Sequence, residues 1–413
     1  MEAIKNKEKN LISKTKQELS EEEFNKLSNP SYDLEKEKEE FKTNILTAYR
    51  NLVDILKEYL DMDKEYYNIV ALWIIGTYFH KEFPSYPFLY FNAQKGSGKS
   101  RAMNLITFTS KDGTMMNSMT EAVLFRTKGT LGIDEYEGMT RKGNENLREL
   151  LNSAYKKGIK IKRMKQQKTL EGIKLVVEEF EVYRPILIAN IWGMESVLGD
   201  RCIPLILEKS HRKEIINLVE IFHEDSKVME TKKLLNQCSL CSFLSFQKAY
   251  KKWNSFVKNN YTNYINNINN TNYISYNLLF KSLNLMDLNG RELELSLPLC
   301  LVANEISSKI LKETTLTLKK IFSDKRAEEL VEDRDTSLID FVSQEPPRTI
   351  YQMSHFTEKF KEFLGVSDDW INVKWMGRAL KRLNLIKEKR RVGKGVQIEL
   401  NVEKAQKRIK MFK

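Results

Sequence analysis

Residues 93–100 read Ala-Gln-Lys-Gly-Ser-Gly-Lys-Ser, and these residue types at this spacing suit the binding of a triphosphate. The segment follows the phosphate-loop pattern G-x-x-x-x-G-K-[ST], except that Ala93 replaces the first glycine. Its two glycines allow the backbone to direct successive N–H groups at phosphate oxygens. We expect Lys99 to contact the β- and γ-phosphates of ATP and the Ser100 hydroxyl to bind Mg²⁺.

An apolar run precedes this segment and a helical pattern follows it, which favours a strand–loop–helix unit over an ordinary flexible turn. The helix would add its positive N-terminal end to the phosphate site. The residues predicted to contact the nucleotide are Ala93, Gln94, Lys95, Gly96, Ser97, Gly98, Lys99, Ser100 and Arg101.

Two carboxylates, Asp134 and Glu135, directly follow the apolar run at residues 131–133. In an NTPase with this loop, we expect their strand to lie beside the strand that precedes the loop. Asp134 would then hold Mg²⁺, directly or through water, and Glu135 would polarise the attacking water. A solvated acidic turn is the alternative.

Two further polar residues stand at strand boundaries. Asn190 ends the apolar run 186–190, where it could orient the attacking water, although asparagine commonly ends a strand for local reasons. Arg201 precedes the apolar run 202–207. It could act as an arginine finger on a neighbouring subunit's γ-phosphate. The alternative for Arg201 is a salt bridge to Asp200.

The elements that must position these residues alternate between strand and helix patterns. Apolar runs at 88–91, 130–133 and 185–189 are separated by helical segments at 101–108 and 144–156. This alternation predicts an α/β core with a parallel sheet and crossover helices. Helical spacing at 41–60 and 69–83 predicts two earlier helices, the second stopped by a proline. Residues 210–258 and 278–330 also have helical patterns, and the Asn-rich stretch 259–277 between them predicts a surface loop.

Positive charge gathers at the C-terminal end of the sequence. Of a formal net charge of +12, residues 371–413 contribute 14 Lys and Arg against 3 Glu. Helical patterns at 350–364 and 373–385, followed by a basic hairpin over 386–400, predict a winged helix. Its second helix could enter a major groove and its wing could meet phosphates, and a protein-docking role is the alternative. The DNA-contacting candidates here are Lys374, Arg378, Lys381, Arg382, Lys389, Arg390, Arg391 and Lys394.

No apolar signal core begins the sequence, and its longest apolar stretch is too short to span a bilayer. We therefore expect a cytoplasmic protein without a membrane partner. Cys238 and Cys241 have C-x-x-C spacing but neither a second pair nor a nearby histidine, so reduced thiols are a simpler interpretation than a zinc site.

These motifs together resemble the AAA+ ATPases of plasmid, phage and mobile-element replication proteins, in the branch of minichromosome-maintenance-like and superfamily-three helicases. The resemblance covers roughly residues 65–310. It rests on the helix at 71–80, the loop, the acidic pair, residues 188–190, Asp200-Arg201, and Gly290-Arg291-Glu292 with Leu297-Pro298-Leu299, which is similar to a helical lid segment.

The resemblance implies a homo-oligomeric ring, usually a hexamer, with ATP at subunit interfaces and DNA in a central pore. It also implies that the predicted hairpin over residues 156–183 projects into the pore, with Lys165 and Lys168 reaching the DNA backbone. An exposed basic hairpin without a DNA role is the alternative. No primase-like segment precedes the ATPase, so a separate primase or replication initiator would supply that activity.

The predicted organisation has five parts. These are a charged, partly flexible segment (1–40), a helical region (41–84), an AAA+ P-loop core (85–209), a helical lid region (210–344) and a basic winged-helix domain (345–413). The leading hypothesis is an ATP-dependent DNA helicase or translocase. The second is an ATP-controlled DNA-binding switch, such as a loader, regulator or transposition accessory. A third is a defence or chaperone-like ATPase that engages proteins.

Overall fold

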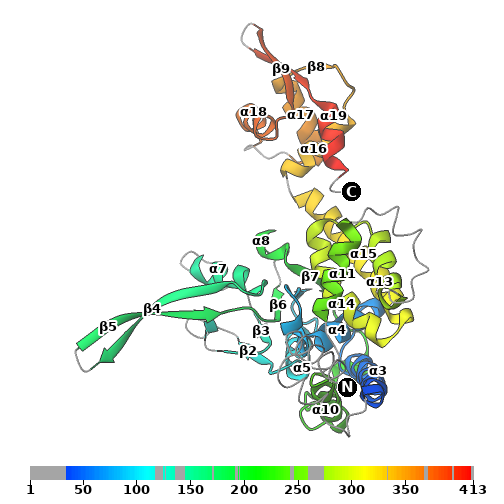
Figure 1. Cartoon of the computed structure of the whole chain (residues 1–413). Helices are drawn as coiled ribbons and strands as arrows, with labels where there is room; N and C mark the ends of the chain where they lie inside the picture. The colour runs from blue at the N-terminus through cyan, green and yellow to red at the C-terminus, as the bar shows by residue number, and fades with distance from the viewer. Residues whose placement is uncertain are drawn as a thin grey trace, which may run out of the picture. The chain divides into compact units, whose positions relative to one another are not determined.

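The computed structural model describes residues 34–116, 124–125, 127–134, 145–169, 172–190, 194, 196–241, 246–258, 274–332, 334–366, 371–392 and 395–410 (Figure 1). Its helices are α3 (Leu34–Tyr59), α4 (Lys64–Thr77), the 3₁₀ turn η1 (His80–Glu82), α5 (Lys99–Thr109), α7 (Glu145–Ala154), α8 (Ser196–Gly199), α9 (Lys213–Ile216), α10 (Ser226–Cys238), α11 (Phe246–Lys258), α13 (Ile274–Leu285), α14 (Gly290–Ile306), α15 (Ser308–Glu332), α16 (Arg334–Gln344), α17 (Met353–Leu364), α18 (Val373–Arg382) and α19 (Val402–Ile409). Its strands are β1 (Phe88–Ala93), β2 (Thr114–Met116), β3 (Leu131–Ile133), β4 (Lys160–Thr169), β5 (Gly172–Glu181), β6 (Ile186–Asn190), β7 (Cys202–Leu207), β8 (Ile350–Gln352), β9 (Ile386–Val392) and β10 (Gly395–Leu400).

The chain forms two compact units, residues 1–318 and residues 319–413. The first contains a five-stranded parallel sheet in the order β2-β3-β6-β1-β7. Its central strands β1 and β6 are almost wholly buried, which explains their near-continuous apolar sequences. The prediction of an α/β core with a parallel sheet is confirmed.

Helices α3 and α4 pack into the first unit. In α4 all residues from Tyr67 to Thr77 are buried, and the Trp73 indole donates to the Pro87 carbonyl just before β1 (2.8 Å). Helix α3 begins at Leu34, so residues 34–40 form its first turns rather than part of the charged N-terminal segment. The predicted helix start at Ser20 and the rest of that segment lie outside the described residues.

The region 210–258, predicted to be helical, contains α9, α10 and α11, and residues 217–225 between α9 and α10 are not helical. The other helices differ from prediction mainly at their ends. Helix α13 begins at Ile274, inside the stretch predicted as an Asn-rich loop, whose residues 259–273 are not described. Helix α14 begins with a capping box, in which Asn289 accepts from the Glu292 N–H while Glu292 accepts from the Asn289 N–H. This cap fixes where α14 starts.

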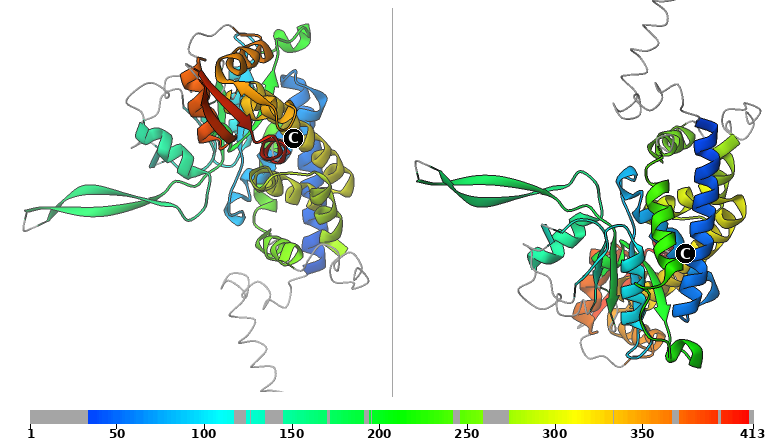
Figure 2. Two further views of the ribbon diagram at one scale, coloured as in Figure 1. Left: turned by 90° about the horizontal axis from the view of Figure 1, so that it is seen from above. Right: turned by 90° about the horizontal axis from the view of Figure 1, so that it is seen from below.

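Strands β4 and β5 form a separate two-stranded antiparallel hairpin. They extend away from the five-stranded sheet in all three ribbon views (Figures 1 and 2). The hairpin is held at its root, where the Phe125 and Phe180 rings stack with centroids 4.8 Å apart and Arg163 lies over Phe125. Buried Arg184 donates to Thr127 Oγ1 (2.8 Å) and to the Leu124 carbonyl (2.9 Å) beside this stack.

The second unit has its own apolar core beneath a three-stranded antiparallel sheet in the order β8-β10-β9. Helix α16 contributes Leu338, Ile339, Phe341 and Val342 to that core. The unit therefore begins before residue 345, the predicted domain start. Residues 350–352, predicted as the start of a helix, instead form β8, which pairs with β10. Among the described residues, no helix combines the length and the apolar character needed to cross a bilayer.

Candidate functional site

The Gly-rich loop, residues 93–98, connects the carboxyl end of β1 to the N-terminus of α5. Gly96 and Gly98 adopt φ values of 80° and 82°, a left-handed conformation that other residues seldom take. Gly98 is also the N-cap of α5, whose first helical residues are Lys99 and Ser100. The loop thus places a lysine and a hydroxyl in the first turn of a helix, where unpaired backbone N–H groups favour an anion.

Lys99 and Ser100 converge on Asp134, which follows β3. The Lys99 Nζ lies 2.9 Å from Asp134 Oδ1, and the Ser100 hydroxyl donates to Asp134 Oδ2 over 3.1 Å. The side chains of Lys99 and Asp134 are each 13% exposed, so the ion pair is shielded but open on one side. A carboxylate and a hydroxyl at this separation offer the oxygen ligands that Mg²⁺ prefers.

The sheet order corrects one prediction about this site. We expected the strand that ends at Asp134 to lie beside the strand that precedes the loop, but β6 lies between β3 and β1. Helix α5 starts at the end of β1 and packs against β6 and β3, so its first turn bridges the gap to Asp134. The first turn of α5, rather than a neighbouring strand, therefore brings Lys99 and Ser100 to Asp134.

Asn190, the last residue of the intervening strand, is buried and in register with Asn92 of β1. It therefore lies at the same carboxyl edge as the Gly-rich loop and Asp134, the edge where parallel α/β sheets bind ligands. Glu135 lies outside the described residues, so its role stays a prediction.

A cavity of about 770 Å³ opens beside the loop, within the range of small-molecule sites. Residues 94–98 of the loop line it, as do Lys99 and Ser100 of α5. Residues that no sequence motif marks also line it: Tyr59, Leu60, Asp61, Leu207, Lys209, Ser210, Ile215, Ile216 and Glu220. A Cβ added to Gly96 would meet the Lys209 side chain at 3.6 Å, which brings a further cation to the loop. Only the tertiary fold places Lys209 here.

Arg101, predicted to contact the nucleotide, lines this cavity but donates elsewhere. Its guanidinium bonds to the carbonyls of Ile215 and Leu218, and its Nε lies 3.4 Å from Glu220. All these acceptors belong to the segment that follows β7.

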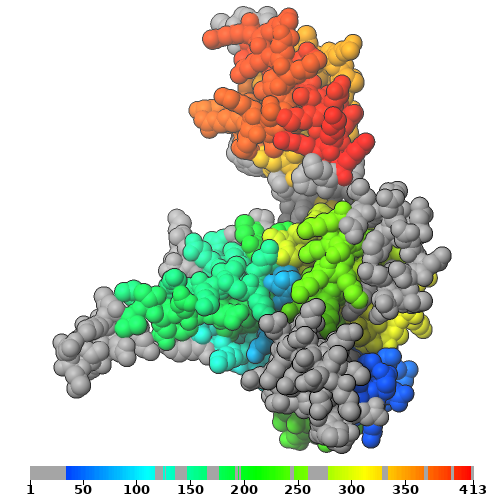
Figure 3. Space-filling model, viewed as in Figure 1, coloured from blue at the N-terminus to red at the C-terminus, as the bar shows by residue number. Residues whose placement is uncertain are grey.

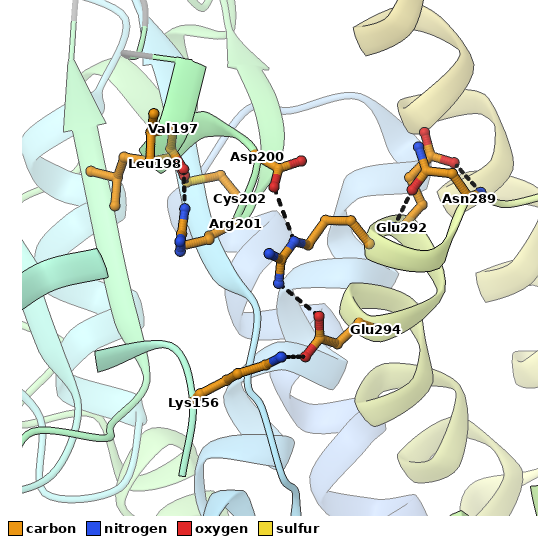
Figure 4. Close-up of polar contacts among 10 residues, drawn as sticks. Lys156, Val197, Leu198, Asp200, Arg201, Cys202, Asn289, Glu292 and Glu294 are labelled. Atoms are coloured by element: carbon orange, nitrogen blue, oxygen red, sulfur yellow. Dashed lines mark hydrogen bonds and ion pairs between the residues drawn. The ribbon is translucent and has the colours of Figure 1, made fainter. Parts of the chain in front are cut away.

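Arg201 lies at the opposite edge of the sheet, in the turn before β7. Its carbonyl accepts from the Phe88 N–H at the start of β1 (3.0 Å), so the length of β1, about 17 Å, separates it from the end of that strand. The predicted alternative, a salt bridge to Asp200, is not formed. Figure 4 shows Arg201 donating to the Val197 carbonyl, and its Nε is buried without a hydrogen-bond partner among the described residues.

Asp200 is instead engaged by Arg291 of α14, with Nε and Oδ2 3.0 Å apart. Arg291 also pairs with Glu294 (2.7 Å), which in turn pairs with Lys156 (3.1 Å) (Figure 4). This chain of ion pairs ties the turn that carries Arg201 to the start of α14.

The hairpin has ion pairs at its root and, farther out, lysines whose ladder partners are apolar. Lys160 and Lys162 lie 3.0 and 3.4 Å from Glu179, and together they hold the pKa of that exposed carboxyl below its usual value. Farther out, Lys165 and Lys168 stand opposite Val176 and Ile173 in the ladder, and their side chains lie outside the described set. The described part of the hairpin projects from the sheet-bearing body (Figure 3). Its Met164 and Val177 side chains are more than half exposed.

The basic candidates of the second unit are exposed, but two already have acidic partners. Arg382 forms a two-pronged pair with Asp335 (2.6 and 3.0 Å), and Arg390 pairs with Glu388 (3.0 Å). Lys374, Arg378 and Lys381 lie on exposed positions of α18, and Lys389 and Arg391 on exposed positions of β9. Lys394 falls outside the described residues.

Comparison with known proteins found no family model that matches the chain and no matching curated protein. The functional argument therefore depends on the geometry of the site.

Proposed function

We propose that this chain binds ATP with Mg²⁺ and hydrolyses it at the carboxyl edge of its parallel sheet, with residues 93–100 acting as the P-loop of an AAA+-type core. The observation that carries the proposal is the convergence of Lys99 and Ser100 on Asp134. Lys99 and Ser100 also line a cavity large enough for a nucleotide.

The residues present fit a magnesium–triphosphate complex. Ser100 and Asp134 would hold the ion, which would neutralise charge on the β- and γ-phosphate oxygens. Lys99 can exchange its Asp134 partner for phosphate oxygens by rotating its flexible side chain, and the loop N–H groups complete the cradle. Asn190 would orient the attacking water, and Glu135 would polarise it.

The position of Arg201 favours action between subunits. Within one chain it lies at the edge of the sheet opposite to Lys99 and Asp134, so it cannot complete the site that its own chain forms. A ring in which the amino edge of one subunit meets the carboxyl edge of the next would bring Arg201 to a neighbour's γ-phosphate. We propose such a homo-oligomeric ring, with a hexamer as its expected size.

DNA is the proposed substrate of the motor. The outer part of the β4–β5 hairpin carries Lys165 and Lys168, whose ladder partners are Val176 and Ile173, and such a basic hairpin suits contact with phosphates. The second unit combines helices α17 and α18 with a small antiparallel sheet whose β9 strand is basic, an arrangement that suits a winged helix on duplex DNA. ATP hydrolysis would then drive movement on DNA or its unwinding, in replication of a mobile element and with a separate primase or initiator as partner.

A strand-displacement assay on a forked duplex tests this proposal. We expect displacement that requires ATP and Mg²⁺ and that is abolished by Lys99→Ala. ATP-dependent DNA binding without displacement would support the alternative, an ATP-controlled DNA-binding switch. Absence of adenine-nucleotide binding in calorimetry would reject both.

A further inference from the structure

The segment that leaves β7 runs along one side of the nucleotide cavity. We call residues 208–225 the strap. At its start, the Ser210 hydroxyl donates to Asp61 Oδ2 beyond the end of α3 (2.6 Å). At its end, Asp225 accepts from the Tyr59 hydroxyl (3.2 Å), and the Phe222 ring packs against Tyr59 with centroids 6.1 Å apart. The strap is thus fastened to the C-terminal end of α3 at both ends.

Arg101 fastens the middle of the strap to α5. Its Nη2 donates to the Leu218 carbonyl over 2.7 Å, its Nη1 donates to the Ile215 carbonyl, and its Nε lies near Glu220. Asn104, one turn farther along α5, also reaches Glu220 (3.4 Å). A planar guanidinium spans these acceptors in a way that a lysine ammonium does not. Because the Arg101 side chain is only 16% exposed, its donors serve the strap rather than solvent.

The strap and the end of α3 supply the apolar part of the cavity wall. Ile215 and Ile216 line the same cavity as the Gly-rich loop, as do Tyr59 and Leu60. Ile215 is buried, but Ile216 remains 53% exposed. A large apolar side chain left open on the wall of a cavity is suited to an apolar face of a ligand. On the proposed function, the cations and backbone N–H groups of the loop would take the phosphates, and the apolar wall would remain for the base.

From this geometry we propose that the strap and the end of α3 form the subsite for the nucleotide base, with Ile216 against its face, and that Arg101 is a positioning residue that holds this subsite beside the phosphate loop. The inference rests on the proposed nucleotide binding and deepens it. It assigns Arg101 to the strap rather than to the phosphates. Base and phosphate affinities are then separable, because Ile216 meets only the base.

Comparing the affinities for ATP and for tripolyphosphate tests the inference, because tripolyphosphate presents phosphates without a base. Dissociation constants for both, with Mg²⁺, are measured for the full chain and for Ile216→Ser, Arg101→Met and Arg101→Lys. Val219→Ser is the matched control, because Val219 is a 69% exposed strap residue that is not among those lining the cavity. Ile216→Ser changes an exposed side chain, so it should fold even if Arg101→Met does not.

We expect Ile216→Ser and Arg101→Met to weaken ATP binding about tenfold and to leave tripolyphosphate binding within about twofold. Arg101→Lys should give an intermediate loss, and Val219→Ser none. Unchanged ATP affinity in Ile216→Ser would overturn the base subsite. Equal losses of ATP and tripolyphosphate in Arg101→Met would overturn the positioning role and indicate a phosphate contact. If the wild-type chain binds neither ligand, the proposed function itself fails.

Discussion

Asp134 accepts from two different side chains of α5, and both contacts use the same carboxylate that would hold the metal. The ion pair with Lys99 is largely shielded from solvent, so each charge stabilises the other. A bound metal would take over the role of Lys99 at this carboxylate and release the lysine for phosphate. On the proposed function, the free and the nucleotide-bound site would differ mainly in which partner Lys99 has.

Asp134→Asn tests this exchange at the scale of one residue. The amide oxygen can still accept from Ser100, but it lacks the charge that attracts Mg²⁺ and Lys99. We expect Mg²⁺-dependent hydrolysis to fall by about a hundredfold or more, as for the loss of one strong electrostatic contribution, with nucleotide binding in EDTA retained. Steady-state hydrolysis and equilibrium dialysis measure the two. Asp287→Asn is the control, because Asp287 is exposed and has a positive φ that asparagine also tolerates. A normal rate in Asp134→Asn would exclude it as metal ligand.

At the scale of the element, the hairpin combines an ion-paired root with an outer part of different composition. An isolated two-stranded ribbon is marginally stable in water, so packing at the root, with the Phe125–Phe180 stack, is the main support of the hairpin. The ion pairs of Lys160 and Lys162 with Glu179 are exposed and add little to its stability. Two kinds of lysine therefore occur in one element: Lys160 and Lys162, which pair with Glu179, and Lys165 and Lys168, whose ladder partners are Val176 and Ile173.

The hairpin offers a matched pair of double substitutions with equal charge change. Lys165→Ala/Lys168→Ala should reduce DNA-stimulated ATP hydrolysis at least about fivefold, because it removes cations from the outer part of the hairpin that is proposed to meet DNA phosphates. Lys160→Ala/Lys162→Ala removes cations already paired with Glu179, so stimulation should stay within about twofold. Initial rates with and without single-stranded DNA measure both. Equal losses of DNA stimulation in the two double variants would mean that the total charge of the hairpin, and not the position of its lysines, determines the stimulation.

His80, between α4 and β1, predicts a pH dependence of folding. The ring is buried, its Nδ1 lies 2.8 Å from the Thr77 carbonyl, and burial first, then Lys81, Arg184 and Lys157, lowers its pKa to about 4. Below the unfolded pKa of 6.5, the unfolded state binds a proton that the folded state does not. This contribution to stability is therefore present above pH 6.5 and is lost as pH falls towards 4.

Urea unfolding measures this loss. Between pH 7 and pH 5 the wild-type chain should lose about 2 kcal/mol more than His80→Gln, from 1.36 kcal/mol per pKa unit. The comparison with His80→Gln removes the contribution of other titrating groups. Parallel pH profiles for the two proteins would show that His80 is not the responsible group.

At the scale of the whole molecule, the boundary between the two units lies between their apolar cores. It does not lie at the Pro346-Pro347 pair, where the sequence indicated a linker. Helix α16 lies before the Pro346-Pro347 pair but belongs to the core of the second unit. The Glu345 carboxylate is buried there, paired with Lys359 (3.0 Å) and hydrogen-bonded by the Tyr351 hydroxyl. Burial first, then the hydrogen bond to Glu345 and its charge, raise the pKa of Tyr351 to about 12.

Fragments of the second unit test both its boundary and its DNA role. Residues 319–413 should unfold cooperatively, whereas residues 345–413, without α16, should lack a stable core. The longer fragment should bind duplex DNA with an affinity that falls as salt rises, and Lys374→Ala/Arg378→Ala should reduce that slope by about one unit for each phosphate that is no longer neutralised. Circular dichroism and fluorescence anisotropy give the two readouts. Salt-independent or absent binding would point to a protein-docking unit.

The sequence alone was sufficient for the local features of the site. A loop with its glycines, Lys99 and Ser100 is contiguous, so its conformation and the helix that follows it depend on near neighbours. Buried strands likewise appear in the sequence as apolar runs, and for this reason the parallel sheet was predictable. Asp134 was identifiable because it directly ends such a run.

Only the tertiary structure decided which distant groups meet. In the structure, β6 lies between β3 and β1, and Arg101 donates to the strap. Arg382 pairs with Asp335, and Arg201 lies at the edge of the sheet away from Lys99. None of these contacts joins near neighbours along a motif. They depend on strand order and helix packing. Those in turn depend on the burial of apolar residues throughout the chain, which a local sequence pattern does not contain.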